Sequence, residues 1–564
     1  MDSLPQELID LIVSYLHVDA LNNTLTLSRK FCLATERESR VWECIVIDDT
    51  GVAMFLQTYC SKYRFQHLNS LLYLTNLPPL RASRKTRESR KSGGDCEPSD
   101  CRDTREELRG MDEAFSHQIF CLFTALKKLE EQIGKEYYTG RVDLRIYTPS
   151  REIRDGLCLH LKFVCWRIHL LSPELLPELS VIRTLEFTQE SFTGSVCEET
   201  ERTSAKIDPR VILDMAAKLP KLEYLRCDLW EDGWDTDKES DGIKHYTREW
   251  EGPRRDARQH FANALLATVL PPSLKEMMLG FEGLFSKPEH IDHRQSLPNL
   301  IKPAPYDLFS SSLRILSYRL RKLQLFVVAD ETLFWPVDGS EPSWPNLERL
   351  NVMFHMVTPK GGWYFQGLNG EGKTTEGFDI SNASYPPLGK DDTDSKWDGD
   401  YPDKMDMMDW SQEGSGHFRI VPHDELLSPF LTAFAKAAAR MPLLRKAVLW
   451  TPLYFSDWDE FGEDEIRELT RFPEQNLSWG VVYVAPGKRS FHTIQEHIGP
   501  YRPYSDHRRL WWKVGKWRPN PELHDLFQRI GRHRAPEKLI EYWEDHYHGQ
   551  GLVKYDVLAS CSLF

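Results

Sequence analysis

A short phrase recurs along this chain and limits the folds that it can adopt. An amphipathic helical stretch is followed by a proline or polar turn and then by L-x-x-L-x-L or a close relative. Such a unit predicts a strand with alternating inward side chains, fed by a helix across a tight turn. One unit cannot bury its own apolar face, whereas stacked units can. The phrase occurs at residues 220–225, 273–279, 320–325, 345–350 and 441–449, with weaker versions at 66–71 and 181–187.

The spacing of the phrase leaves two interpretations open. Its anchor residues are separated by 40, 52, 49, 24 and 97 residues, whereas leucine-rich repeats run about 20–29 residues, so only one interval fits. We therefore expect either a degenerate leucine-rich-repeat-like α/β solenoid with long inserted loops or an α/β domain built from similar helix–strand units. We favour the solenoid because the helix-then-strand phrase itself recurs. The anchors are Ile182, Leu222, Leu274, Leu323, Leu347 and Leu444.

Composition argues against several classes of protein. The formal net charge is −14, and an acidic chain is not expected to be a dedicated nucleic-acid binder, which usually has a basic face. The 11 cysteines are scattered without a CxxC pair, which fits a reducing compartment, so we expect a cytoplasmic or nuclear protein. The first ten residues lack the basic and apolar regions of a signal peptide. No apolar run approaches about 18 residues, so we expect no membrane span.

Apolar residues near the N-terminus follow the period of a helix. Leu8, Leu11, Ile12, Tyr15 and Leu16 form one stripe, and two further amphipathic stretches follow. Three short helices in so few residues cannot build a generous core, so such a module is expected to keep an apolar side for a partner. The alternative is that these residues are only the first lobe of the larger domain.

These N-terminal residues resemble an F-box. The resemblance rests on an LPxEL opening at residues 4–8, an L-S-x-x-F segment at residues 27–31 and a closing Trp42. It implies that residues 1–47 bind the Skp-type adaptor subunit of a cullin–RING ubiquitin ligase, and that the rest of the chain binds a target protein. An apolar helical face of this kind suits helix packing between two chains. The positions implied for the adaptor contact are Leu4, Pro5, Leu8, Ile12, Leu16 and Leu27.

The chain after the F-box-like module divides by composition. Residues 48–80 are expected to be a connecting segment or first scaffold unit, residues 81–110 a flexible polar linker or loop, and residues 111–564 the repeat-like scaffold. Most of residues 111–560 resembles the uncharacterised region that follows the F-box in many filamentous-fungal proteins, which implies an architecture but no activity.

Two charged stretches inside these regions have competing interpretations. The basic residues at 84–91 could act in nuclear import, although a solvated loop is favoured. The acidic stretch 386–416 is expected to be a loop rather than a calcium site, because its spacing does not match a calcium-binding loop.

One segment matches a catalytic motif letter for letter. Residues 367–374 read G-x-x-x-x-G-K-T, the pattern of a nucleotide-binding P-loop. A P-loop needs a helix directly after it, and the following residues have no helical apolar period and contain Gly377, Pro386 and Pro387. We therefore expect a chance match.

Two C-terminal segments are also candidate sites. The basic and aromatic run 507–518 is expected to be a strand with buried tryptophans, paired with 481–485, rather than a nucleic-acid site. The group from Asp545 to His548 is expected to be ordinary surface or core side chains rather than a metal site.

The sequence therefore favours an interaction protein with no catalytic residues, no cofactor and no metal, in which a target held on the scaffold is brought close to the ubiquitin-charged enzyme. Two rivals remain open. One is a binding scaffold that acts outside any ligase, and the other is a nucleotide hydrolase acting through residues 367–374.

Overall fold

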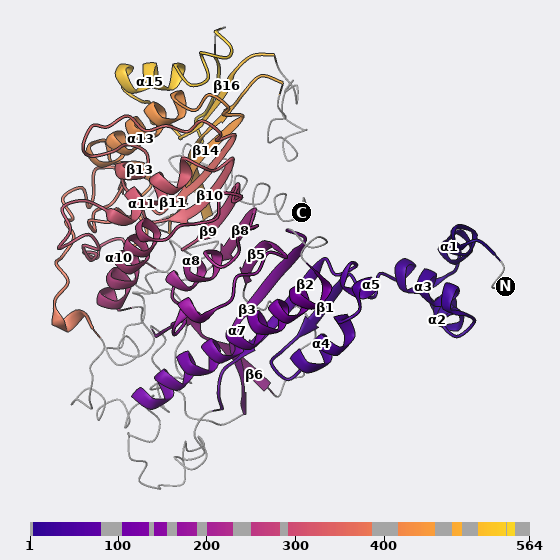
Figure 1. The fold of residues 1–564 in the computed structure, drawn as a ribbon. Coiled ribbons are helices and arrows are strands. Elements are labelled where there is room, and N and C mark those ends of the chain that lie inside the picture. The colour runs from indigo at the N-terminus through magenta and orange to yellow at the C-terminus, as the bar shows by residue number, and fades with distance from the viewer. Residues whose placement is uncertain are drawn as a thin grey trace.

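The structure is a computed structural model in which a small helical module projects from a large α/β body (Figure 1). The basic run 84–91, nearly all of the acidic stretch 386–416, and His548 lie outside the described residues. The described residues are 4–79, 104–134, 140–154, 166–188, 200–228, 250–281, 291–385, 416–456, 476–487, 506–536 and 539–546.

A 13-stranded sheet forms the centre of the body (Figure 1). Its first nine strands are parallel and lie side by side in chain order. They are β1 (Cys44–Ile47), β2 (Ser70–Asn76), β3 (Val142–Arg154), β5 (Ile182–Thr188), β8 (Tyr224–Asp228), β9 (Glu276–Gly280), β10 (Lys322–Val327), β11 (Arg349–Phe354) and β14 (Lys446–Tyr454).

Four further strands complete the sheet. β15 (Asn476–Val484) is antiparallel to β14, β16 (Arg509–Lys513) is antiparallel to β15, and β17 (Ile540–Glu544) is parallel to β16. β6 (Thr200–Ser204) is antiparallel to the end of β3. Two small sheets lie apart from it, formed by β4 (Arg167–Ile168) with β7 (Lys206–Ile207) and by β12 (Phe365–Gln366) with β13 (Val421–Pro422).

The helices of the body pack on one face of the large sheet (Figure 1). Crossovers between parallel strands are right-handed, so a strand order that never reverses places successive helices on the same side. No described helix has both the length and the apolar character that a membrane span requires. The helices are α4 (Val52–Tyr59), α5 (Lys62–Phe65), α7 (Arg105–Ile133), α8 (Arg210–Ala216), α10 (Glu251–Ala267), α11 (Leu308–Ser317), α13 (Asp424–Ala439) and α15 (Pro521–Gln528), with 3-10 turns η3 (Pro173–Leu175), η5 (Glu331–Leu333) and η6 (Asn382–Ser384).

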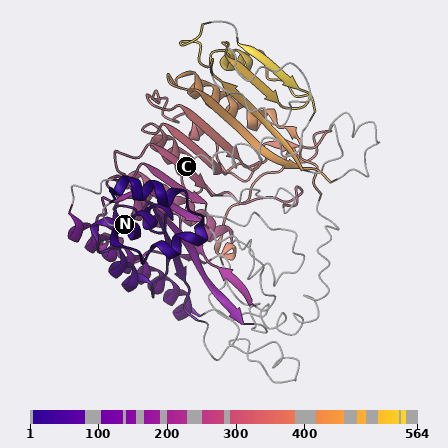
Figure 2. The same ribbon diagram turned by 90° about the vertical axis from the view of Figure 1, so that its right-hand side faces the viewer.

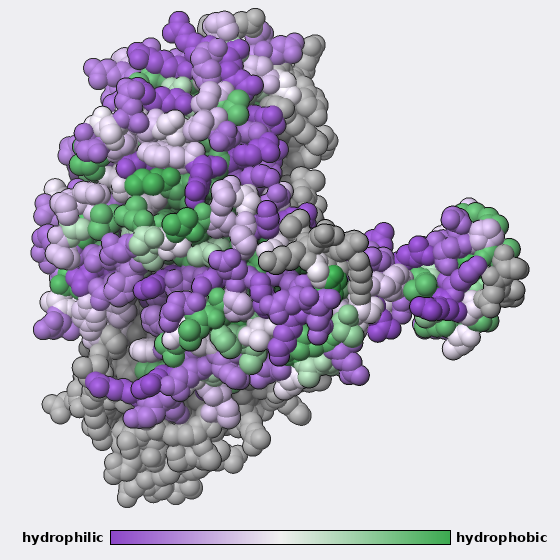
Figure 3. Space-filling view, viewed as in Figure 1, coloured by the Kyte–Doolittle hydropathy of each residue, from purple (hydrophilic) through white to green (hydrophobic). Residues whose placement is uncertain are grey.

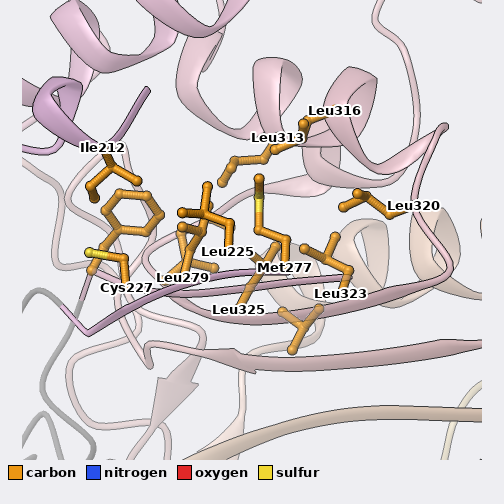
Figure 4. Packing of buried hydrophobic residues seen from close by; sticks show 14 of the residues in the cluster. Ile212, Leu225, Cys227, Met277, Leu279, Leu313, Leu316, Leu320, Leu323 and Leu325 are labelled. Carbon is orange, nitrogen blue, oxygen red and sulfur yellow. The ribbon is translucent and has the colours of Figure 1, made fainter. Parts of the chain in front are cut away.

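Each recurring phrase leads into one strand of this sheet. The anchors are buried, and in the close-up Leu313 and Leu316 of α11 lie over Met277 and Leu323 of the strands (Figure 4). One anchor is shifted: Leu320, not Leu323, is equivalent to the others. Arg321 N–H donates to Lys275 O, so the residue before Arg321 matches Leu274. The phrase L-x-x-L contains two candidate anchors three residues apart, and only the backbone pairing separates them.

The sheet is also buried on its second face, at its C-terminal strands. Phe326, Met353 and Trp450 lie on neighbouring strands, each pointing away from the helices. A strand buried on both faces has a nearly continuous apolar sequence rather than an alternating one. This explains the uninterrupted apolar runs at 325–329 and 447–450. The other buried members of this second cluster are Val448, Val482, Val484 and Trp511.

Two expected boundaries need correction. The module was expected to end at residue 47, but β1 already belongs to the large sheet, and the third helix ends at Glu38. The segment 48–80 forms α4, α5 and β2, the first scaffold unit. The expected linker 81–110 runs too far, because α7 begins at Arg105. Thr104 and Glu107 form a capping box there, a signal already present in the sequence.

The anchors give a stability prediction. Leu320→Ala should lower the free energy of unfolding by about 3 kcal/mol, because it leaves a cavity at a fully buried position. Urea unfolding followed by circular dichroism measures the change. Leu443→Ala, at a partly exposed position of a matching turn, is the control and should cost less than about 1 kcal/mol. Equal losses for both variants would contradict the assignment of Leu320 to the repeated core.

Candidate protein-docking face

The N-terminal module has a core of its own. Its helices α1 (Gln6–Ser14), α2 (Val18–Thr24) and α3 (Arg29–Glu38) enclose a small buried cluster. Polar bonds tie the helices together: Gln6 Nε2 donates to Lys30 O (3.1 Å), and Lys30 Nζ donates to Leu4 O (2.8 Å). The buried members of the cluster are Ile9, Val13, Leu21, Phe31 and Ala34.

The apolar stripe identified in the sequence lies largely on the other side of α1. Leu8, Leu11, Ile12 and Tyr15 are 47%, 52%, 42% and 83% exposed. The space-filling view shows hydrophobic surface on the module, away from the body (Figure 3). A module that is already folded around its own small core therefore presents a second apolar surface to solvent.

The six positions implied for an adaptor contact divide into two groups. Leu8, Ile12 and Leu27 are exposed, and Pro5 is exposed at the start of α1. Leu4 and Leu16 are half-buried against the core of the module, so they support the face rather than form it. Sequence reasoning left out Leu11, Tyr15 and Leu25, although the helical period already placed the first two on the stripe. We name the exposed apolar residues Leu8, Leu11, Ile12, Tyr15, Leu25 and Leu27 the docking face.

The body meets the module on a different side. Tyr63 Oη donates to Leu33 O (3.0 Å), and Arg64 pairs with Glu36 (3.5 Å). The guanidinium of Arg64 also lies 4.2 Å from the ring centre of Trp42. These contacts reach α3 and the segment after it. In Figure 1 the module stands off from the body, and in Figure 2 it lies in front of the body, toward the viewer. The docking face is therefore left open by the described part of the body.

The backbone N–H groups of the P-loop-like segment form hydrogen bonds within the segment itself. Gly367 N–H donates to Glu371 O (3.0 Å), Asn369 N–H to Glu371 Oε2 (3.0 Å), and Lys373 N–H to Gly370 O (3.2 Å). A P-loop needs these N–H groups for phosphate. Lys373 Nζ lies 2.9 Å from Glu425 of α13, and the chain after Thr374 has no helical turn before η6. This arrangement is unsuited to a nucleotide.

A buried arginine explains one glycine of the same segment, Gly372. The side chain of Arg419 donates to the carbonyls of Phe365 (3.1 Å) and Gly372 (3.0 Å), to His293 O (2.8 Å), and to Thr375 Oγ1 (3.0 Å). Burial lowers the pKa of Arg419 to about 10. Gly372 has φ +69°, and a Cβ there would collide with the guanidinium. The loop is thus shaped to enclose a cation of the protein itself.

Two buried carboxylates, one at the start of α11 and one after β10, are the other group with unusual chemistry. Asp330 accepts from Thr332 N–H (3.0 Å) and Oγ–H (2.6 Å), and Asp307 pairs with Arg258 (2.5 Å). Burial, followed by the charge of Asp307, raises the pKa of Asp330 to about 7. A raised pKa can mark a catalytic acid. Here, however, both carboxylates begin helical turns, Asp307 at α11 and Asp330 at η5, so we interpret them as structural.

The basic and aromatic run 507–518 forms β16, and the predicted pairing with 481–485 is confirmed by Val482 opposite Trp511. Trp511 and Trp512 are buried on opposite faces of the sheet. Arg508 Nη1 donates to Gln528 O (2.8 Å) and Ile530 O (2.7 Å), so its charge is used inside the fold. Among the described residues, no group of three or more His, Cys, Asp and Glu side chains is placed to hold a metal ion.

The loop geometry gives one prediction. Gly372→Ala should lower the free energy of unfolding by about 2 kcal/mol, because alanine is strained at this φ and its Cβ meets Arg419. Lys373→Ala should cost less than about 1 kcal/mol, since its ion pair is exposed. Calorimetry with ATP should give no binding heat for the parent chain or either variant. ATP binding that Lys373→Ala abolishes would instead establish a nucleotide site.

The buried carboxylate gives a second prediction. Because the pKa of Asp330 is raised in the folded state, its contribution to stability is present below about pH 4 and is lost as pH rises toward 7. Asp330→Asn mimics the protonated form at every pH. The free energy of unfolding of the parent chain should therefore fall relative to Asp330→Asn between about pH 4 and 7, on the order of a few kcal/mol. A constant difference across this range would show that Asp330 is ionised in the fold.

Comparison with known proteins identifies no relative. No protein-family model matches the chain, and no curated protein matches it. What the chain does must therefore be argued from its own residues, and the docking face is the part of the described surface that points most directly to a partner.

Proposed function

We propose that this chain is the substrate-recognition subunit of an SCF-type cullin–RING ubiquitin ligase. Its helical module acts as an F-box that binds the Skp-type adaptor, and the α/β body acts as a degenerate leucine-rich-repeat-like scaffold that binds a target protein in the cytoplasm or nucleus. The chain carries no catalytic residues in this role. It raises the effective concentration of the target near the ubiquitin-charged enzyme.

The exposed stripe on α1 carries this proposal. Burying a leucine or isoleucine side chain contributes roughly 1.5–3 kcal/mol, so leaving Leu8, Leu11 and Ile12 in water forgoes several kcal/mol. A lone surface leucine needs no explanation, but a contiguous stripe along one helix is typical of helix packing between chains. Tyr15, the most exposed of the four, adds an aromatic side chain of the kind enriched at binding hot spots.

The alternative that the helices are the first lobe of the body is less well supported. A lobe would turn its apolar stripe toward the body, whereas the junction uses polar and aromatic contacts from Tyr63, Arg64 and Trp42. The core of the module also excludes all body residues. Among the described residues, its apolar stripe therefore has no intramolecular partner of the kind that a lobe would have.

The body supports the scaffold half of the proposal. Stacking of helix–strand units in chain order gives an elongated array in which each unit contacts its neighbours. Irregular unit lengths suit this architecture, because additional residues can leave the array as loops without disturbing the ladder of strands. Such arrays provide extended surfaces for protein recognition.

Co-purification with the adaptor tests the proposal. Leu8→Glu/Ile12→Glu should reduce adaptor recovery at least about a hundredfold, because two charges would enter an apolar interface. The matched control is Leu266→Glu/Val269→Glu, which places the same charges on exposed apolar positions of the body and should leave recovery unchanged. A deletion variant should end at Ser39, before β1, so that the sheet keeps its edge strand.

Two results would reject the proposal. The parent chain could fail to bind the adaptor at all, which would favour a binding scaffold outside any ligase. Alternatively, binding could survive both the double substitution and the deletion, which would move the contact to another surface. Circular dichroism of each variant establishes that the body remains folded.

A further inference from the structure

The helix-to-strand turns meet at one rim of the sheet. Glu223 N–H donates to Arg183 O (2.8 Å), Lys275 N–H to Glu223 O (2.9 Å) and Arg321 N–H to Lys275 O (2.7 Å). The ladder continues from Glu348 N–H to Arg321 O (2.8 Å) and from Arg445 N–H to Glu348 O (2.7 Å). Residues far apart in the sequence are thereby fixed about 4.8 Å apart, one per strand. Basic side chains are frequent along this ladder, and we name Lys221, Lys275, Arg321, Lys322, Arg349, Arg445 and Lys446 the basic rim.

Two carboxylates on the rim, Glu348 and Glu276, are less exposed than the cations that they pair with, whereas Glu223 is 31% exposed beside Lys275 at 45%. Glu348 lies 2.7 Å from Arg321 and 3.0 Å from Arg445, so one carboxylate serves two guanidinium groups. The side chain of Glu348 is 10% exposed, whereas those of Arg321 and Arg445 are 51% and 43% exposed. Glu276, which pairs with Lys322, shows the same difference: its side chain is 15% exposed, and that of Lys322 is 39% exposed. The outward surface therefore displays positive charge, even though ion pairs neutralise part of it.

This surface has the opposite sign to the whole chain, whose net charge is −14. Basic residues at helix C-terminal ends also offset the helix dipole, which is a purely structural role. That role does not require two consecutive cations at one turn, as in Arg321–Lys322 and Arg445–Lys446. It also does not explain Arg349, which is exposed at the start of β11. Glu341 lies in the longer turn before β11, and its negative charge is paired with Arg440 at 2.7 Å.

We infer that the basic rim binds an Asp/Glu-rich segment of a protein partner. Its cationic side chains lie on successive strands and do not converge on one point. A phosphate group favours convergent donors, such as two arginines and backbone amides, on a single anion. Carboxylates distributed along an extended chain instead match a row of separate cations. Because both partners remain partly hydrated, the contact contributes mainly to selectivity and association rate.

The inference deepens the proposed function by naming the chemistry of the target, and it rests on the body being the target-binding part. It does not depend on the docking face, because the rim lies in the turns of the body. A binding measurement that contains no ligase component therefore separates the two. Loss of adaptor binding would not affect the inference about the basic rim, and absence of acidic-peptide binding at the rim would not affect the proposed adaptor contact.

Fluorescence anisotropy of the full chain tests the inference. The probe is a fluorescein-labelled peptide in which glutamate alternates with serine, and a glutamine–serine peptide is its uncharged counterpart. The acidic peptide should bind the full chain, more weakly as salt is added, and the uncharged peptide should not. Lys221→Glu/Arg349→Glu should weaken binding at least about fivefold, because two exposed attractions become repulsions.

The matched control is Arg109→Glu/Lys360→Glu, which makes the same charge change on α7 and in the segment after β11, away from the rim. It should keep binding within about twofold. Equal weakening by both double variants would overturn the inference, because peptide binding would then depend on the net charge of the chain and not on the basic rim. Absence of binding to the acidic peptide would also overturn it.

A phosphoserine peptide or single-stranded RNA that binds more tightly, and loses its binding with the rim variant, would assign the rim to phosphate instead. Thermal unfolding of each variant confirms that it is folded.

Discussion

The backbone ladder between neighbouring strands is the interaction on which the rest of this structure depends. A single helix–strand unit of this chain has one apolar face and no means of covering it, because its own helix shields only part of the strand. Pairing with the next unit satisfies the strand's N–H and C=O groups and extends the layer of helices at the same time. Since the strand order does not reverse from β1 to β14, the described helices of this part lie on one face. The helical layer, the buried anchors and the charged rim all follow from this ordering.

The chemistry of the loops follows the same logic at shorter range. The segment Gly367–Thr374 matches a phosphate-binding motif by letters, but its amides are bonded within the loop and the carbonyl of Gly372 accepts a hydrogen bond from Arg419. A motif of this length specifies glycines where the backbone turns sharply, and a turn around a buried guanidinium needs the same residues as a turn around phosphate. The spacing of glycines therefore cannot tell the two apart, whereas the missing helix after Thr374 can.

The fold was predictable from the sequence to the extent that local patterns determine it. The recurring phrase predicted a strand at each of its occurrences, because alternation of apolar residues after a turn reflects burial directly. The pairing of 481–485 with 507–518 was predictable for the same reason. The position of the fourth anchor was not, because Leu320 and Leu323 are both buried and only tertiary pairing distinguishes them.

The module shows a similar limit. Helix α1 has a polar side formed by Gln6, Glu7, Asp10 and Ser14, but its apolar side is wide, so its period identified a stripe but could not decide whether Ile9 and Val13 or Leu8 and Ile12 face inward. The candidate contact set was consequently mixed, with Leu4 and Leu16 supporting the core while Leu8, Ile12 and Leu27 are exposed. The start of α7 was missed for a different reason. Its first turn is charged and resembles the preceding polar stretch, and only the capping box at Thr104 separates them.

An array of this kind also fixes distances that a flexible chain could not. Neighbouring strands are about 4.8 Å apart, so the nine parallel strands from β1 to β14 span about 38 Å, however many residues leave the array between them. The module is attached beside β1, at one end of this span, through α5 and Trp42. Insertions can therefore vary the rim and the loops without changing the separation between the docking face and the far strands. In the proposed function, which relies on proximity rather than chemistry, a rigid row of strands preserves this separation.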